Sequence, residues 1–210
     1  MKAERDPIAD PAVAPSAWNI ANALTLVRIA MVPVFALLLV HDHGTDPLWR
    51  VLATATFAIA VVTDRVDGEI ARKRGLVTDF GKVADPIADK ALMGTALVAL
   101  SALGELPWWV TVVVLVREIG ITVLRFVVIR HGVIPASHGG KLKTVLQALA
   151  IGLYLLPLKD WFGDWAGAVQ WWVMLAAVAV TVVTGLDYIV QAVRLRRTSE
   201  RTLAKRAGNA

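Results

Sequence analysis

Long apolar runs separated by short polar connectors dominate the pattern of this chain. A membrane-spanning helix needs about 20 mostly apolar residues, and six runs approach or exceed that length. They cover residues 23–40, 49–72, 82–104, 107–130, 142–158 and 167–193. The pattern therefore predicts an all-α polytopic membrane protein with six transmembrane helices.

Composition agrees with this prediction. Hydrophobic residues make up 57% of the 210 residues, and the mean hydropathy is +0.61, which is too high for an ordinary soluble domain. The sequence has no cysteine, which excludes disulfides, zinc–thiolate sites and a cysteine nucleophile. The net charge of +5 does not indicate nucleic-acid binding, because the basic residues flank the apolar runs.

The distribution of lysine and arginine orients the predicted helices. The connectors at 41–47 and 103–107 contain neither residue, and the connector at 157–167 contains only Lys159. The opposite connectors and the chain end carry Arg72, Lys73, Arg74, Lys82, Arg130, Lys141, Lys143, Arg194, Arg196, Arg197, Arg201, Lys205 and Arg206. The positive-inside rule places this side, with both termini, in the cytoplasm.

This orientation also predicts how the chain is organised. We expect a flexible leader at 1–18, a transmembrane domain at 19–193 and a basic cytoplasmic tail at 194–210 that meets anionic headgroups. The expected location is the bacterial cytoplasmic membrane.

Four aspartates stand at the predicted cytoplasmic edge of the second and third runs. Carboxylates are costly at membrane depth and need a reason to be there. On helices, Asp64 and Asp67 share one face at i,i+3, and Asp85 and Asp89 share another at i,i+4. If the two helices meet, four like charges converge, and that density calls for divalent cations. The pattern predicts a metal site at the membrane surface.

The spacing around these aspartates is D-x2-D-G-x2-A-R-x8-G-x3-D-x3-D. It resembles the defining motif of the CDP-alcohol phosphotransferase family. Each fixed position is matched, by Asp64, Asp67, Gly68, Ala71, Arg72, Gly81, Asp85 and Asp89. The resemblance implies a six-helix membrane enzyme, usually a homodimer, whose active site opens to the cytoplasm. Such enzymes transfer a phosphatidyl group from a CDP-linked lipid to an alcohol and release CMP.

The resemblance also implies roles for the aspartates. Asp64, Asp67 and Asp85 would ligate a pair of divalent ions, and Asp89, in the same four-aspartate metal site, would be the base that deprotonates the acceptor hydroxyl. Oxygen-only ligands suit Mg2+ or Mn2+ better than zinc.

The other motif residues would bind the CDP-lipid. Gly68, Ala71 and Gly81 lack bulk and would let the nucleotide lie close to the backbone, although small residues also serve close helix packing. Arg72 would either contact the pyrophosphate or hold an aspartate, and the sequence leaves both roles open.

The identity of the acceptor depends on residues outside the motif. The segments 19–28, 85–90, 117–125 and 140–147 together resemble the phosphatidylglycerophosphate synthase branch of the family. In that branch the donor is CDP-diacylglycerol and the acceptor is sn-glycerol 3-phosphate. A basic pocket near the cytoplasmic ends of the first, fourth and fifth runs would hold the acceptor phosphate. Its predicted members are Arg28, Arg117, Lys141, Lys143 and Thr144.

Several alternatives stay open at this point. Arg117 could instead form a structural ion pair with Glu118 or with another span, and Lys141 and Lys143 could only anchor the topology. The acceptor could be inositol phosphate, or phosphatidylglycerol as in a cardiolipin synthase. A divalent-cation transporter is a remote alternative, because it would need carboxylates near the bilayer midplane rather than at one end.

Overall fold

The computed structural model describes residues 20–74, 78–128 and 138–207. Within these ranges every regular element is a helix. The elements are α1 (Ile20–Val40), η1 (His41–Gly44), α2 (Pro47–Arg74), α3 (Asp79–Ala102), α4 (Trp108–Val128), α5 (His138–Leu155), α6 (Leu158–Phe162) and α7 (Asp164–Ala207). The six long helices coincide with the six predicted runs to within a few residues, except that α7 continues past residue 193. The all-α prediction is confirmed.

Three of the long helices satisfy simple length and hydropathy criteria for a membrane span. The qualifying segments are Asn22–Gly44, Pro47–Val66 and Asp164–Arg196, and Leu142–Leu155 is a shorter apolar helix. Helices α3 and α4 are 24 and 21 residues long, but both carry several charged residues in their apolar sequence. The described residues thus indicate a membrane protein, while six spans with cytoplasmic termini stay a prediction.

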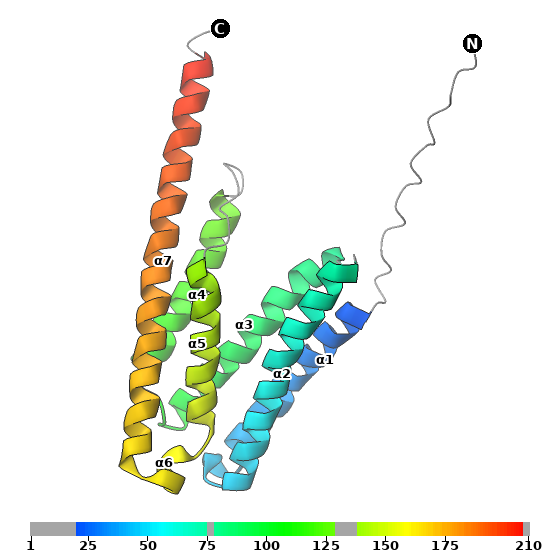
Figure 1. Cartoon of the computed structure of the whole chain (residues 1–210), viewed down its shortest axis with the longest axis vertical. Helices are drawn as coiled ribbons and strands as arrows, with labels where there is room; N and C mark the ends of the chain where they lie inside the picture. The colour runs from blue at the N-terminus through cyan, green and yellow to red at the C-terminus, as the bar shows by residue number, and fades with distance from the viewer. Residues whose placement is uncertain (1–19, 75–77, 129–137, 208–210) are drawn as a thin grey trace, which may run out of the picture.

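The helices alternate in direction and form two groups (Figure 1). Helices α1, α2 and α3 pack together, and α7 packs against both α4 and α5. Contacts of α3 with α4 and α5, and of α2 with α5, join the groups. The end of α2, the start of α3 and the end of α4 lie toward the same end of the molecule, the upper end of Figure 1, and η1 and α6 lie at the other.

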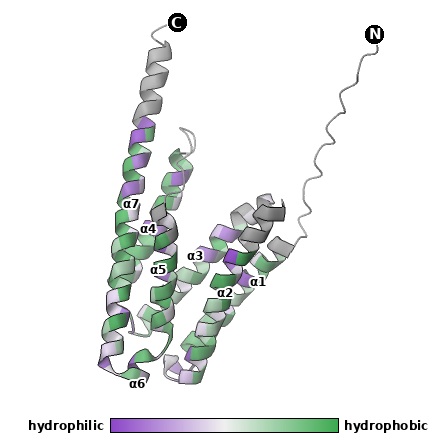
Figure 2. Cartoon of the chain, viewed as in Figure 1, coloured by the Kyte–Doolittle hydropathy of each residue, from purple (hydrophilic) through white to green (hydrophobic). Residues whose placement is uncertain are grey.

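The core lies between these helices and is almost entirely aliphatic and aromatic. Buried side chains from all six long helices meet there, including Phe35, Phe57, Leu97, Val114, Ile151 and Met174. Large apolar residues such as Leu37, Phe126 and Trp172 face outward and are exposed. Figure 2 shows this apolar character along the helix shafts. Contiguous apolar surface of this kind suits lipid or another membrane helix.

A buried arginine ties the helices together at the end opposite the aspartates. The Arg50 guanidinium, near the start of α2, donates to the main-chain oxygens of Tyr154 (2.7 Å) and Leu155 (3.2 Å) and to Glu105 Oε1 (2.6 Å). These bonds satisfy carbonyls at the end of α5 that have no partner within the helix. The contact fixes the spacing of α2, α5 and the α3–α4 connector.

Glycine at position 81 leaves room for the close packing of α1 on α3. Thr78 caps α3: its Oγ1 accepts from the Gly81 N–H at 3.1 Å and donates to Asn22 Oδ1 at 2.9 Å. A Cβ at Gly81 would lie 3.0 Å from Asn22 Oδ1. The space above Gly81 is therefore taken by a side chain of α1.

The predicted boundary between membrane domain and basic tail falls inside α7. This helix is 44 residues long and runs without interruption to Ala207. The backbone therefore shows no break at residue 194. The predicted leader at 1–18 lies outside the described residues.

Candidate active site

Side chains of helix α1 contact two of the motif aspartates, which lie on α2 and α3. Arg28, whose side chain is fully buried, forms an ion pair with Asp64 of α2. Thr25 donates its hydroxyl hydrogen to Asp85 Oδ1 of α3 at 2.6 Å. Because both contacts come from one face of α1, that helix fixes how the carboxylates of α2 and α3 are presented.

Asp89 lies one helical turn beyond Asp85 on α3. Its carboxylate is half-buried and within electrostatic reach of Asp64, Lys90, Lys143 and Glu118. Its charged neighbours therefore include a motif aspartate on α2 and charged residues on α4 and α5.

The predicted metal site is described only in part. The side chains of Asp67, Ala71, Arg72 and Lys141 lie outside the described part of the structure. Among the side chains that are described, no three His, Asp or Glu residues are grouped closely enough to hold a metal. The donors that are present, the carboxylates of Asp64, Asp85 and Asp89, are hard oxygen ligands whose chemistry fits Mg2+ or Mn2+.

A cavity of about 240 Å³ opens beside Asp89 between α3, α4 and α5. Its polar lining is Asp89, Lys90, Glu118, Lys143, Thr144 and Gln147, and its apolar lining includes Met93, Leu97, Val114 and Leu115. The cavity brings the predicted base together with two of the predicted acceptor-binding residues.

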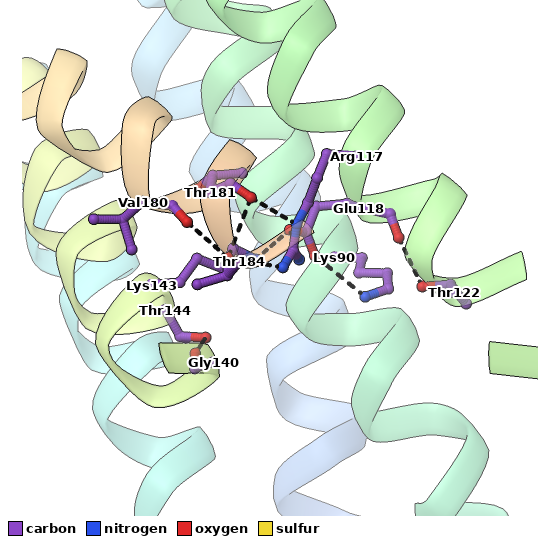
Figure 3. A network of polar contacts seen from close by, with 10 residues as sticks. All are labelled: Lys90, Arg117, Glu118, Thr122, Gly140, Lys143, Thr144, Val180, Thr181 and Thr184. Carbon is purple, nitrogen blue, oxygen red and sulfur yellow. Dashed lines mark hydrogen bonds and ion pairs between the residues drawn. The ribbon is translucent and has the colours of Figure 1, made fainter. Parts of the chain in front are cut away.

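Glu118 is the centre of a charged network at this cavity (Figure 3). Its Oε1 accepts from Lys143 Nζ and from Arg117 Nη1, the latter at 3.0 Å, and its Oε2 lies 3.5 Å from Lys90 Nζ. Three cations surround this carboxylate, and with the nearby Asp89 counted the five groups carry one net positive charge when all are ionised. The sequence suggested Glu118 only as a partner of Arg117, although an acid beside a base inside an apolar run was a signal.

Arg117 connects α4 to α7 through its other nitrogens. Nε donates to Thr181 O at 3.1 Å, and Nη2 donates to Thr184 Oγ1 at 3.1 Å. A Cβ at Gly185 would lie 3.1 Å from Arg117 Cγ, so glycine gives the arginine its room. The structural ion pair that the sequence left open is present, and Arg117 does not line the described cavity.

Of the remaining predicted site residues, Thr144 lines the cavity and Arg28 does not. Arg28 is sealed against Asp64 and is absent from the described lining of the cavity, so the structure does not group it with Lys143 and Thr144. The Thr144 hydroxyl donates to Gly140 O at 3.2 Å, a bond within α5. Gly68 is half-buried on α2.

Comparison with known proteins identifies the class. The family model for CDP-alcohol phosphatidyltransferases matches residues 18–183, which include every position of the aspartate motif. The chain belongs to this family and is a transferase. Membership confirms the resemblance that the motif predicted, and the divalent-cation transporter is set aside.

Individual relatives narrow the class. The chain is 56% identical over 176 residues to a Mycobacterium tuberculosis (strain H37Rv) protein named "Probable phosphatidylglycerophosphate synthase", covering 84% of this chain and 82% of that protein. It is 37% identical to the CDP-diacylglycerol–glycerol-3-phosphate 3-phosphatidyltransferase of Bacillus subtilis, with 81% and 93% coverage. It is 30% identical to a Streptomyces coelicolor cardiolipin synthase (CMP-forming), with 85% coverage of both chains.

Proposed function

We propose that this protein transfers the phosphatidyl group of CDP-diacylglycerol to sn-glycerol 3-phosphate, giving phosphatidylglycerophosphate and CMP. The observation that carries the proposal is the cavity in which Asp89 lies beside Lys143, Lys90 and the Glu118 network. The names of the relatives with 56% and 37% identity support the same acceptor.

The charge balance of the cavity favours a phosphorylated acceptor. Glu118 and Asp89 offset two of the three positive charges of Lys90, Arg117 and Lys143, and the remaining positive charge complements a phosphate. Lys143 is the best-placed ligand, because its buried ammonium lies at the cavity. Thr144 and Lys141, which lie on the same helix α5, are proposed to assist Lys143. Arg28 and Arg117 are reassigned to positioning Asp64 and Glu118.

The cavity also favours a small acceptor. Its volume of about 240 Å³ lies below the roughly 300–1,000 Å³ of pockets that take drug-sized molecules. A three-carbon phosphate is compatible with that size. Phosphatidylglycerol carries a phosphodiester with a single charge and two acyl chains, so it matches neither the volume nor the charge. The volume and the charge therefore support glycerol 3-phosphate over phosphatidylglycerol as the proposed acceptor.

The proposed reaction is a substitution at phosphorus. The primary hydroxyl oxygen of the acceptor bonds to the phosphorus that carries diacylglycerol, and the bond from that phosphorus to the bridging pyrophosphate oxygen breaks. The bond electrons leave with CMP, and the hydroxyl proton passes to the Asp89 carboxylate. Gly68, Ala71 and Arg72 are proposed to accommodate the CDP-lipid, whereas Gly81, also expected to do so, gives its space to Asn22.

Two divalent ions, Mg2+ or Mn2+, are proposed to complete the site. Asp64, Asp67 and Asp85 would hold them, with Asp89 at the edge of the set, and their charge would stabilise the pyrophosphate and departing CMP. Thr25 and Arg28, which contact Asp85 and Asp64, are proposed to orient these two carboxylates for the ions. We also propose a homodimer in the bacterial cytoplasmic membrane, with the site facing the cytoplasm and anionic headgroups.

An acceptor comparison tests the proposal. Full-length protein in detergent is given CDP-diacylglycerol with glycerol 3-phosphate, inositol phosphate or phosphatidylglycerol, and CMP release is measured. Glycerol 3-phosphate is expected to give the highest rate. Release with another acceptor, but none with glycerol 3-phosphate, would refute the assignment.

A further inference from the structure

Gln147 presents a buried oxygen that the protein leaves without a partner. The residue lies on α5 one helical turn beyond Lys143, is 4% exposed and lines the cavity beside Asp89. Its side-chain Oε1 has no hydrogen-bond partner in the described structure. Buried polar atoms are nearly always paired, so an orphaned carbonyl on a residue that lines a cavity calls for an explanation.

The other described polar groups of the cavity do not supply the missing donor. The ammonium groups of Lys90 and Lys143 face Glu118, and the Thr144 hydroxyl donates to Gly140 O. Asp89 and Glu118 accept hydrogen bonds when ionised. A molecule bound in the cavity can supply the donor that the described side chains do not.

The chemistry of that donor follows from the proposed function, on which this inference rests. An acceptor whose phosphate lies at Lys143 extends its carbon chain along the cavity, and one turn of α5, about 5.4 Å, is on the scale of a three-carbon chain. Glycerol 3-phosphate has two hydroxyls. The primary hydroxyl attacks phosphorus, which leaves the secondary hydroxyl as the free donor.

We propose that Gln147 Oε1 accepts a hydrogen bond from the secondary hydroxyl of the acceptor and so determines specificity for a polyol phosphate. A site built around such a bond rejects an analogue that lacks the hydroxyl, because the buried carbonyl then stays unpaired. In this proposal Gln147 selects the acceptor by this hydrogen bond and takes no part in the proton transfer.

The test compares two acceptors on each variant. Glycerol 3-phosphate and 3-hydroxypropyl phosphate share the phosphate and a primary hydroxyl and differ in the secondary hydroxyl. For the unmodified protein, kcat/KM is expected to favour glycerol 3-phosphate by about tenfold or more. In Gln147→Met the preference is expected to fall within about threefold, because neither acceptor then meets a carbonyl.

Gln170→Met is the matched control. Gln170 is also buried, but it lies on α7 outside the described lining of the cavity, and its Nε2 donates to Leu153 O at 2.7 Å. This variant is expected to keep the unmodified preference. The ratio of two acceptors on one preparation does not depend on how much of that preparation is folded.

The outcomes separate the two proposals. No preference in the unmodified protein, or an unchanged preference in Gln147→Met, overturns the role of Gln147 while the proposed reaction stands. No CMP release from the unmodified protein with glycerol 3-phosphate overturns the proposed reaction. If Gln147→Met turns over neither acceptor, calorimetric binding of the two phosphates to the full-length variant decides, and a retained preference for glycerol 3-phosphate refutes the role.

Discussion

Replacing Lys143 by methionine tests the proposed acceptor phosphate site. The change removes one cation and keeps a side chain of similar length. Glu118 still has Arg117 at 3.0 Å and Lys90 at 3.5 Å, so its carboxylate is not left unpaired. The fold is therefore expected to tolerate the substitution, whereas removal of Glu118 itself would leave three neighbouring cations without their shared partner.

The size of the effect follows from the bond that is lost. A hydrogen bond to a charged group contributes about 1.5–3 kcal/mol, which corresponds to roughly a 10- to 150-fold rise in the KM for glycerol 3-phosphate. The KM for CDP-diacylglycerol is expected to change by less than about threefold, because the proposed pyrophosphate site is built by the aspartates.

Initial rates of CMP release, with each substrate varied in turn, give both constants. Lys159→Met is the control, since that side chain is largely exposed, lies at the opposite end of the molecule and is 3.6 Å from Asp164. It is expected to leave both KM values unchanged. An equal rise in the two KM values of Lys143→Met, or no rise in either, would refute the phosphate-binding role.

Four further predictions concern the base, the metal and the packing. Asp89→Asn is expected to lower kcat by about 10²- to 10⁴-fold with little change in either KM, and near-normal turnover would contradict its role as base. EDTA is expected to stop CMP release, and Mg2+ or Mn2+ to restore it; release that persists in EDTA would count against the metal site. Arg117→Met is expected to lower thermal stability by about 1–3 kcal/mol and kcat/KM for both substrates alike, whereas a selective rise in the acceptor KM would return Arg117 to the phosphate site. Gly81→Ala is expected to cost about 1 kcal/mol in a thermal melt, because the added Cβ meets Asn22 at 3.0 Å. Gly152→Ala, whose Cβ meets nothing within 4 Å, is the control, and equal melting of the two variants would contradict the packing argument.

The long helices could be predicted from the sequence because a run of about 20 apolar residues has few other stable forms in lipid. The short helices η1 and α6 could not, since segments of four and five residues carry no usable periodicity. Several charged residues of α3 and α4, including Asp89, Lys90 and Glu118, line the candidate site, which explains charge inside otherwise apolar helices.

The candidate site was predictable where chemistry depends on local spacing and not where it depends on packing. The aspartate motif gave the family. The partners of Arg28 and Arg117 depend on which helices lie side by side, so residues expected to bind phosphate are instead seen against Asp64 and Glu118. The orphaned oxygen of Gln147 likewise becomes visible only when α3, α4 and α5 are placed together.

The central claim is most directly tested by following the acceptor into lipid. Full-length protein in vesicles that contain CDP-diacylglycerol and Mg2+ is given radiolabelled sn-glycerol 3-phosphate, and label in the organic extract is compared with CMP released. We expect label to appear as phosphatidylglycerophosphate in a one-to-one ratio with CMP. CMP release without labelled lipid, or labelled lipid only when inositol phosphate is the labelled acceptor, would contradict the account.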